Sequence, residues 1–100
     1  MNHWLHPEAE NEFGAAAEYY ASNASPVIAE AYVHEFERVL AILLNNQQLG
    51  TLVGSGLRKY PFRRFPYSVI YRENQAIGPQ IYAIAHQSRE PDYWCERTRP

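Results

Sequence analysis

Arginine is the residue type whose chemistry stands out in this chain. Eight of the nine basic residues are arginine, and Lys59 is the remaining one. The planar guanidinium group binds phosphates and carboxylates through two parallel hydrogen bonds and stacks on aromatic rings, whereas a lysine offers a compact point charge. This choice favours recognition of an anionic partner. A solvated face that happens to use arginine is the alternative.

The charges are divided unequally between the two halves of the chain. Residues 1–50 hold seven acidic residues and one basic residue, a net charge of −6, whereas residues 51–100 hold eight basic and four acidic residues, a net charge of +4. The overall charge of −2 hides this difference. An anionic target or an acidic inhibitor is therefore expected to bind the second half.

His86 and Arg89 are the residues of the second half best suited to chemistry. A histidine titrates near pH ~6.5, in the range required for general acid or base work. Arg89 lies in a polar stretch where core packing explains little, which favours a functional role. For His86 the alternative is a structural residue, hydrogen-bonded at the end of a strand.

Several other chemistries are not supported by the sequence. Cys95 is the only cysteine, so no internal disulfide can form, and the histidines are too scattered for a zinc site. The basic half has no paired carboxylates outside Glu90 and Asp92, which argues against a two-metal nuclease. The glycines at positions 50, 54 and 56 lack the lysine and serine or threonine of a nucleotide-binding loop. We therefore expect neither a metal nor another cofactor.

Two amphipathic helices are predicted in the first half. The first spans residues 7–22, with Pro7 at its first position and an apolar face that begins at Ala9 and Phe13. The second starts at Ser25 as N-cap with Pro26 following, and continues to about Leu44. The short link between them predicts an antiparallel helical hairpin whose acidic residues lie mostly on its outer surface.

The second half shows a strand pattern. After a flexible glycine-containing connection, the pattern predicts a strand over residues 57–65 with a bulge or an unpaired edge at Pro61, because proline donates no ladder hydrogen bond. Residues 67–72 and 80–86 are rich in β-branched and aromatic residues and predict two interior strands joined by a loop. Residues 92–94 suggest one helical turn, followed by a short basic tail.

These elements predict one α+β domain over residues 1–100, with an N-terminal helical hairpin packed on one face of a small, mainly antiparallel sheet and a short C-terminal turn or helix. The other sheet face is expected to stay partly open. The strand ends would bring four arginines together there, forming a concave cationic groove: Arg58, Arg63, Arg64 and Arg89.

Several residue strings resemble a known family. They are RRFPYSVIYR at residues 63–72, IAHQSR at residues 84–89 and PDYW at residues 91–94, together with the helix starts at Pro7 and Ser25-Pro26 and the pair Tyr19-Tyr20. The chain is similar over nearly its whole length to RelE/ParE family toxins of type II toxin–antitoxin systems, a group that includes plasmid stabilisation proteins. The resemblance implies a cognate antitoxin that wraps and neutralises the toxin.

The same fold carries two activities in this family. RelE-like members are endoribonucleases that bind and cut messenger RNA on the ribosome. ParE-like members are inhibitors of DNA gyrase. A non-catalytic binding module, or an inactivated homologue that only binds its antitoxin, is a third possibility.

Metal-independent RNA cleavage needs groups that move protons and cations that stabilise the transition state. The catalytic candidates for this reaction are His86, Arg89, Arg64 and Tyr93. The substrate-binding candidates are Arg58, Lys59, Arg63 and Trp94, although Trp94 also fits a lid packed on the edge of the sheet. Ser68 is neutral where RelE-like enzymes often carry a basic residue, which weakens the nuclease interpretation.

The expected compartment is the cytoplasm. The N-terminus lacks the basic and apolar regions of a secretion signal, and no apolar run approaches the ~20 residues that span a bilayer. We therefore expect no contact with a membrane.

Overall fold

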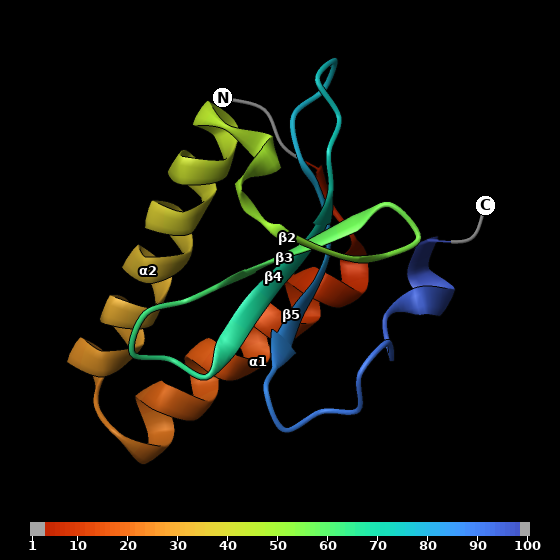
Figure 1. The fold of residues 1–100 in the computed structure, drawn as a ribbon. Coiled ribbons are helices and arrows are strands. Elements are labelled where there is room, and N and C mark those ends of the chain that lie inside the picture. The colour runs from red at the N-terminus through yellow and green to blue at the C-terminus, as the bar shows by residue number, and fades with distance from the viewer. Residues whose placement is uncertain (1–3, 99–100) are drawn as a thin grey trace.

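A computed structural model describes residues 4–98 of the chain (Figure 1). Residues 1–3 and 99–100 are outside this range, so Arg99 of the predicted basic tail lies outside the described residues. The elements follow the expected α+β order, with the helices first and most of the sheet after them. None of the helices within residues 4–98 is long and apolar enough to cross a membrane.

The helical hairpin is confirmed. Helix α1 spans Pro7–Asn23 and helix α2 spans Pro26–Asn45. Ser25 caps α2, because its hydroxyl oxygen accepts a hydrogen bond of 3.1 Å from the backbone N–H of Ile28. At the start of α1 the ring of His6 accepts from the backbone N–H of Glu8 in the same way.

The sheet has five strands in the order β1-β5-β4-β3-β2. The strands are β1 (Trp4–Leu5), β2 (Thr51–Gly54), β3 (Leu57–Pro61), β4 (Tyr67–Arg72) and β5 (Gln80–His86). Strands β4 and β5 are interior and antiparallel, as predicted, and β1 pairs with β5 in parallel. Short 3-10 helices at Gln47–Leu49 and Cys95–Thr98 complete the described elements; the second lies just beyond the predicted helical turn.

Two predictions about the strands were wrong. Strand β2 occupies part of the predicted flexible connection, because Ser55 and Gly56, both with positive φ, form the two-residue turn of a hairpin with β3. Strand β3 ends at Pro61 rather than continuing to residue 65. The unpaired edge predicted at Pro61 is confirmed, because Pro61 pairs with Ser68 of β4 while the pairing of β3 with β2 ends at Lys59. The bulges lie between Leu52 and Gly54 and between Ile70 and Tyr71. Strand β1 was not predicted, since two residues carry no periodic signal.

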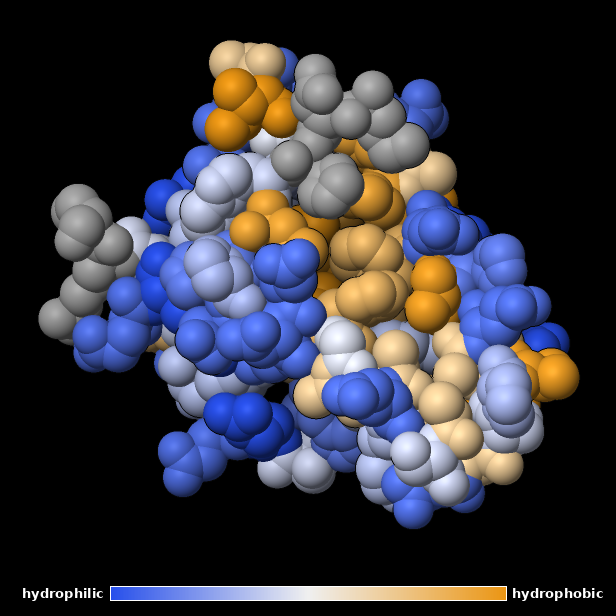
Figure 2. Space-filling model, turned by 180° about the vertical axis from the view of Figure 1, so that it is seen from behind, coloured by the Kyte–Doolittle hydropathy of each residue, from blue (hydrophilic) through white to orange (hydrophobic). Residues whose placement is uncertain are grey.

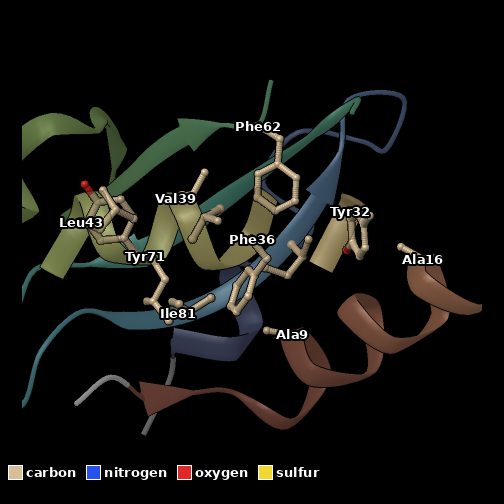
Figure 3. Packing of buried hydrophobic residues seen from close by; sticks show 12 residues of the cluster. Ala9, Ala16, Tyr32, Phe36, Val39, Leu43, Phe62, Tyr71 and Ile81 are labelled. Atoms are coloured by element: carbon tan, nitrogen blue, oxygen red, sulfur yellow. The ribbon is translucent and has the colours of Figure 1, made fainter. Parts of the chain in front are cut away.

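The main core lies between the helices and the sheet. Tyr32 and Phe36 of α2 pack there with Tyr71 of β4 and Ile81 of β5 (Figure 3). Side chains alternate between the two sheet faces, so that Val69 and Tyr71 point to the helices while Ile70 joins a second apolar cluster on the opposite face.

The C-terminal segment covers part of that opposite face, which was expected to be more open. Trp94 is 7% exposed and belongs to the second cluster with Leu57, Ile70 and Tyr82. The expected role of Trp94 as a lid is confirmed, although it packs on the face of the sheet and not on its edge.

The acidic surface of the hairpin is confirmed in part. Five of the seven acidic residues of the first half are exposed, but the side chains of Glu12 and Glu35 are only 15% and 11% exposed. Seen from behind, the molecule shows a central apolar band between two polar flanks (Figure 2). These two half-buried carboxylates line the two surface recesses described next.

Candidate functional site

The four arginines predicted to converge do not share one groove. Arg89 lines a recess of about 270 Å³, whereas Arg63 and Arg64 line a different recess of about 470 Å³. The two recesses have no lining residue in common. Arg58 lines neither of them. The predicted single cationic groove is therefore wrong.

Arg58 is held inside the fold. Its Nη1 atom donates to the backbone oxygens of Gln48, at 3.1 Å, and of Gly50, at 2.8 Å, and its Nε lies 3.8 Å from the Glu73 carboxylate. The side chain is 18% exposed. Arg58 therefore fastens the turn before β2 to the sheet and does not face a substrate, because its strand position directs it toward this turn.

The smaller recess lies between α1 and the end of β5. We call it the Arg89 recess. It brings together three of the four predicted catalytic residues, His86, Arg89 and Tyr93. The other lining residues are Glu12, Ala15, Ala16, Tyr19, Tyr67 and Ile84.

The ring of His86 is engaged by the turn that follows it. Its Nδ1 atom accepts a hydrogen bond of 3.0 Å from the backbone N–H of Ser88, and the Ser88 hydroxyl lies 2.7 Å from the same atom. Because Nδ1 is the acceptor, the neutral ring carries its proton on Nε2. The ring also packs edge-on against Tyr67, with centroids 5.0 Å apart. In this arrangement neither ring nitrogen offers a free lone pair to a substrate.

Glu12 is the centre of the hydrogen bonds that hold the C-terminal segment. Its carboxylate accepts two hydrogen bonds from Arg97, at 2.8 and 2.9 Å, one of 2.8 Å from the Tyr93 hydroxyl and one of 3.0 Å from the backbone N–H of Ile84. Burial would raise the pKa of this carboxyl, but the hydrogen bonds from Arg97, Tyr93 and Ile84 outweigh it and lower the pKa. Glu12 is therefore ionised and saturated with donors.

The same contacts cover an edge of the sheet. Strand β1 pairs with Gln80 and Ile81, and within residues 4–98 the rest of β5 has no neighbouring strand on that side. Glu12 accepts the outward N–H of Ile84, and Arg97 donates to the backbone oxygen of Tyr82 at 3.0 Å. These side chains take the place of a strand and protect the edge from pairing with another chain.

Tyr93 is held by Glu12 through its hydroxyl and by arginines through its ring. The Arg89 guanidinium carbon lies 3.9 Å from the ring centroid and that of Arg97 lies 5.0 Å from it. Burial, followed by the hydrogen bond to Glu12, raises the pKa of Tyr93 well above its ordinary value. The hydroxyl is thus a poor proton donor to a substrate, while the exposed Arg89 is held in a defined orientation.

Lys59 and Trp94 lie beside a third, smaller cavity of about 110 Å³ on the sheet face that carries the second apolar cluster. His86 and Arg89 line this cavity as well. Lys59 is exposed, but the indole of Trp94 is buried against the sheet. The predicted substrate-binding role of Trp94 does not fit this burial, because only 7% of the residue is exposed.

The sequence prediction missed the acidic partners of the site. The prediction that the acidic residues lie mostly on the outer surface of the hairpin did not single out Glu12, although its position between Ala9 and Ala16 at helical spacing places it on the buried face of α1. That spacing was a usable signal. The partner Arg97 gave no signal, because it lies 85 residues from Glu12 in the chain. Within residues 4–98, no three histidine, cysteine or acidic side chains gather as metal ligands.

Comparison with known proteins identifies the class. The fold is α+β, with a helical hairpin on a mixed, mainly antiparallel sheet and an arginine-bearing C-terminal segment. The family model for the ParE toxin of the type II toxin–antitoxin system, parDE, matches residues 5–91. This chain belongs to that family, which confirms the resemblance to RelE/ParE toxins.

A solved structure supports the same fold. It is described as the chromosomal ParDE TA system from P. aeruginosa, and its similar chain is 22% identical in sequence, with a TM-score of 0.71 over 86% of this chain and 95% of that chain. At this identity the likeness concerns the fold alone. No curated protein matches the sequence.

Proposed function

We propose that this ParE-type toxin acts by binding DNA gyrase and not by cutting messenger RNA. Its neutralising partner is a cognate antitoxin, and it acts in the cytoplasm. The observation that carries the proposal is the engagement of both candidate proton-transfer groups within the fold. His86 accepts from Ser88 through Nδ1, and the Tyr93 hydroxyl donates to the ionised Glu12.

RNA cleavage would require these hydrogen bonds to be broken. A protonated His86 could not accept from Ser88, and a tyrosine whose pKa is raised by burial and by Glu12 is a weak acid. The cations that would stabilise the transition state are also divided, with Arg64 in one recess and Arg89 in the other. Such an arrangement supports recognition by a fixed surface better than proton transfer.

Arg89 is the side chain that we assign to target binding. It is exposed, and stacking on Tyr93 limits its conformations. An arginine that is already ordered loses little entropy when it binds a carboxylate or a phosphate. The exposed Tyr19 on the rim of the same recess adds an aromatic contact surface.

The test compares two assays and two variants. Purified toxin is added to a gyrase supercoiling reaction with relaxed plasmid, and separately to ribosomes with a message whose 5′ ends are mapped. We expect inhibition of supercoiling and no new 5′ ends. The variant Arg89→Ala should weaken inhibition about tenfold or more, because truncation of a central interface arginine costs on the order of 2 kcal/mol.

His86→Asn is the matched control, because the amide oxygen can accept the Ser88 N–H while the side chain cannot act as an acid or base. We expect it to inhibit gyrase within about threefold of wild type. Unchanged supercoiling together with new 5′ ends that disappear in His86→Asn would establish the nuclease instead. Normal growth of cells that express the toxin without antitoxin would indicate an inactive homologue.

A further inference from the structure

The larger recess is separate from the Arg89 recess and has no role in the function proposed above. It lies where the first half of α2 meets the end of α1 and the loop that connects β3 with β4. We call it the arginine pocket. It measures about 470 Å³ and is lined by Tyr20, Ile28, Ala31, Glu35, Arg38, Arg63, Arg64 and Phe65.

The pocket has an excess of positive charge. Glu35 is its one carboxylate among three arginines, and both of its oxygens are occupied. Arg38 donates to them at 2.8 and 2.7 Å, and the backbone N–H of Arg63 donates at 2.5 Å. The hydrogen bonds from Arg38 hold the pKa of Glu35 below its usual range, so this carboxylate stays ionised and satisfied. The guanidinium groups of Arg63 and Arg64 form no ion pair within residues 4–98 and face solvent.

Half of the pocket lining is apolar or aromatic. Ile28 is 40% exposed although it lines the pocket, and the neighbouring Val27 is 74% exposed. Ala31 continues this surface along α2, and Phe65 and Tyr20 pack edge-on against each other, with centroids 5.2 Å apart. Exposed aliphatic side chains beside unpaired cations are typical of a surface that a partner covers.

The pocket is formed before any partner arrives. The Arg63 N–H bound to Glu35 fixes the β3–β4 loop to α2, and the buried Phe62 anchors the loop in the core. Arg64 has a φ of 67°, in the left-handed region that non-glycine residues rarely adopt. Backbone strain of this kind is found where a side chain must be presented in a defined direction.

We propose that the arginine pocket binds an acidic peptide segment of a protein partner, with one apolar side chain against Ile28 and Ala31 and a carboxylate on Arg63 and Arg64. Charge complementarity supports this occupant, because a carboxylate neutralises the free guanidinium groups through paired hydrogen bonds. A nucleic acid fits less well. The aliphatic side chains of Ile28 and Ala31 offer a phosphate backbone no polar contact, whereas they can pack against an apolar side chain of a peptide.

The experiment uses the full-length chain and labelled peptides as probes. The panel consists of fluorescein-labelled peptides with one leucine or phenylalanine followed, after zero to three glycines, by two glutamates. Glutamine replaces glutamate in a matched neutral set, and a labelled ten-nucleotide thymidine oligomer represents nucleic acid. We expect saturable anisotropy changes below about 1 mM for at least one acidic peptide, weakened by added salt.

Two charge-matched variants locate the site. Arg64→Gln should weaken the best peptide about fivefold or more, whereas Lys59→Gln, which removes one exposed positive charge outside the pocket, should leave it within about twofold. Amide chemical shifts should move at Ala31 and Glu35 on titration and stay unchanged at Arg89. Any one of four results would overturn the proposal. They are equal weakening of peptide binding by both variants, chemical-shift changes centred on Arg89, tighter binding of the oligonucleotide than of every peptide, and no binding by any acidic peptide. Failure of the gyrase assay would leave it standing, since the two sites share no residue.

Discussion

Glu12 should be the side chain that holds the C-terminal segment on the fold, and its removal should be costly. Glu12→Ala deletes the acceptor of four hydrogen bonds, two from Arg97 and one each from Tyr93 and Ile84. The guanidinium of Arg97, 13% exposed, would lose its counter-charge, and the N–H of Ile84 would be left at an uncovered edge of the sheet.

The magnitude follows from burial. Removal of one partner from a buried ion pair costs about 3–5 kcal/mol, because the remaining charge is uncompensated. Both side chains of this pair are about 15% exposed or less, so water relieves a little of this cost and we expect about 3 kcal/mol. For a chain of 100 residues, this corresponds to a decrease in Tm of about 12 °C or somewhat more.

The measurement is a double-mutant cycle by urea denaturation with Glu12→Ala, Arg97→Met and the double variant. We expect a coupling energy of at least about 1 kcal/mol between the two sites. Glu18→Ala, an exposed acid on the same helix, is the control and should change the free energy of unfolding by less than about 0.5 kcal/mol. If the changes for Glu12 and Arg97 add within about 0.5 kcal/mol, the two residues do not act as a pair and the reasoning is refuted.

The pH dependence gives an independent check of the same carboxylate. The pKa of Glu12 in the folded chain is below its usual value of 4.5, so its contribution to stability is present above that value and is lost as the pH falls through the folded pKa. The difference in unfolding free energy between wild type and Glu12→Gln should therefore shrink steadily from about pH 6 to pH 3. A difference that stays constant over this range would show that the carboxylate is not stabilised by folding.

Further predictions concern buried atoms near α2 and the sheet. Gly50→Ala should destabilise the fold by about 1–3 kcal/mol, because a Cβ atom would lie 2.6 Å from the Tyr71 hydroxyl. Gly14→Ala, in open space within α1, should instead stabilise the fold by about 0.5–1 kcal/mol. Thermal denaturation of both variants is the measurement, and equal changes in stability would contradict this prediction. Tyr32→Phe should be neutral or stabilising by about 1 kcal/mol, since the Tyr32 hydroxyl is buried without a partner within residues 4–98. Tyr71→Phe should instead lower the free energy of unfolding by about 1–3 kcal/mol, because the Tyr71 hydroxyl donates to Gln47 and accepts from Gly50. If urea denaturation showed the Tyr32 variant to be the less stable of the two, the hydrogen bonds described here would be contradicted.

Most of the helices and interior strands could be predicted because their signals are local. The N-cap at Ser25, the apolar spacing of α1 and the alternation along β4 each lie within a short window of sequence. The β2 strand was missed because its formation depends on pairing with β3, which no short window of sequence shows. Gly54 and Gly56 indicate a flexible connection when read alone, and Gly56 forms a tight hairpin turn with Ser55 only because β3 pairs with β2.

The residues of the candidate site also fall into those that sequence patterns identified and those whose role they could not show. Sequence patterns selected His86, Arg89, Arg63 and Arg64 as surface residues with chemistry, and the structure places all four on the linings of recesses. The patterns could not show that the Arg58 side chain is hydrogen-bonded to backbone oxygens, because these oxygens belong to the turn that follows α2.

By itself, therefore, the amino-acid sequence determined the α+β class, the helical hairpin, the two interior strands β4 and β5 and the resemblance to RelE/ParE family toxins, since each depends on residue types at short spacing. Only the tertiary structure decided which cations remain free. Glu12 meets Ile84 across 72 positions and Arg97 across 85, and such pairings follow from strand order and from the path of the C-terminal segment. The division of the arginines into two recesses is a property of that path.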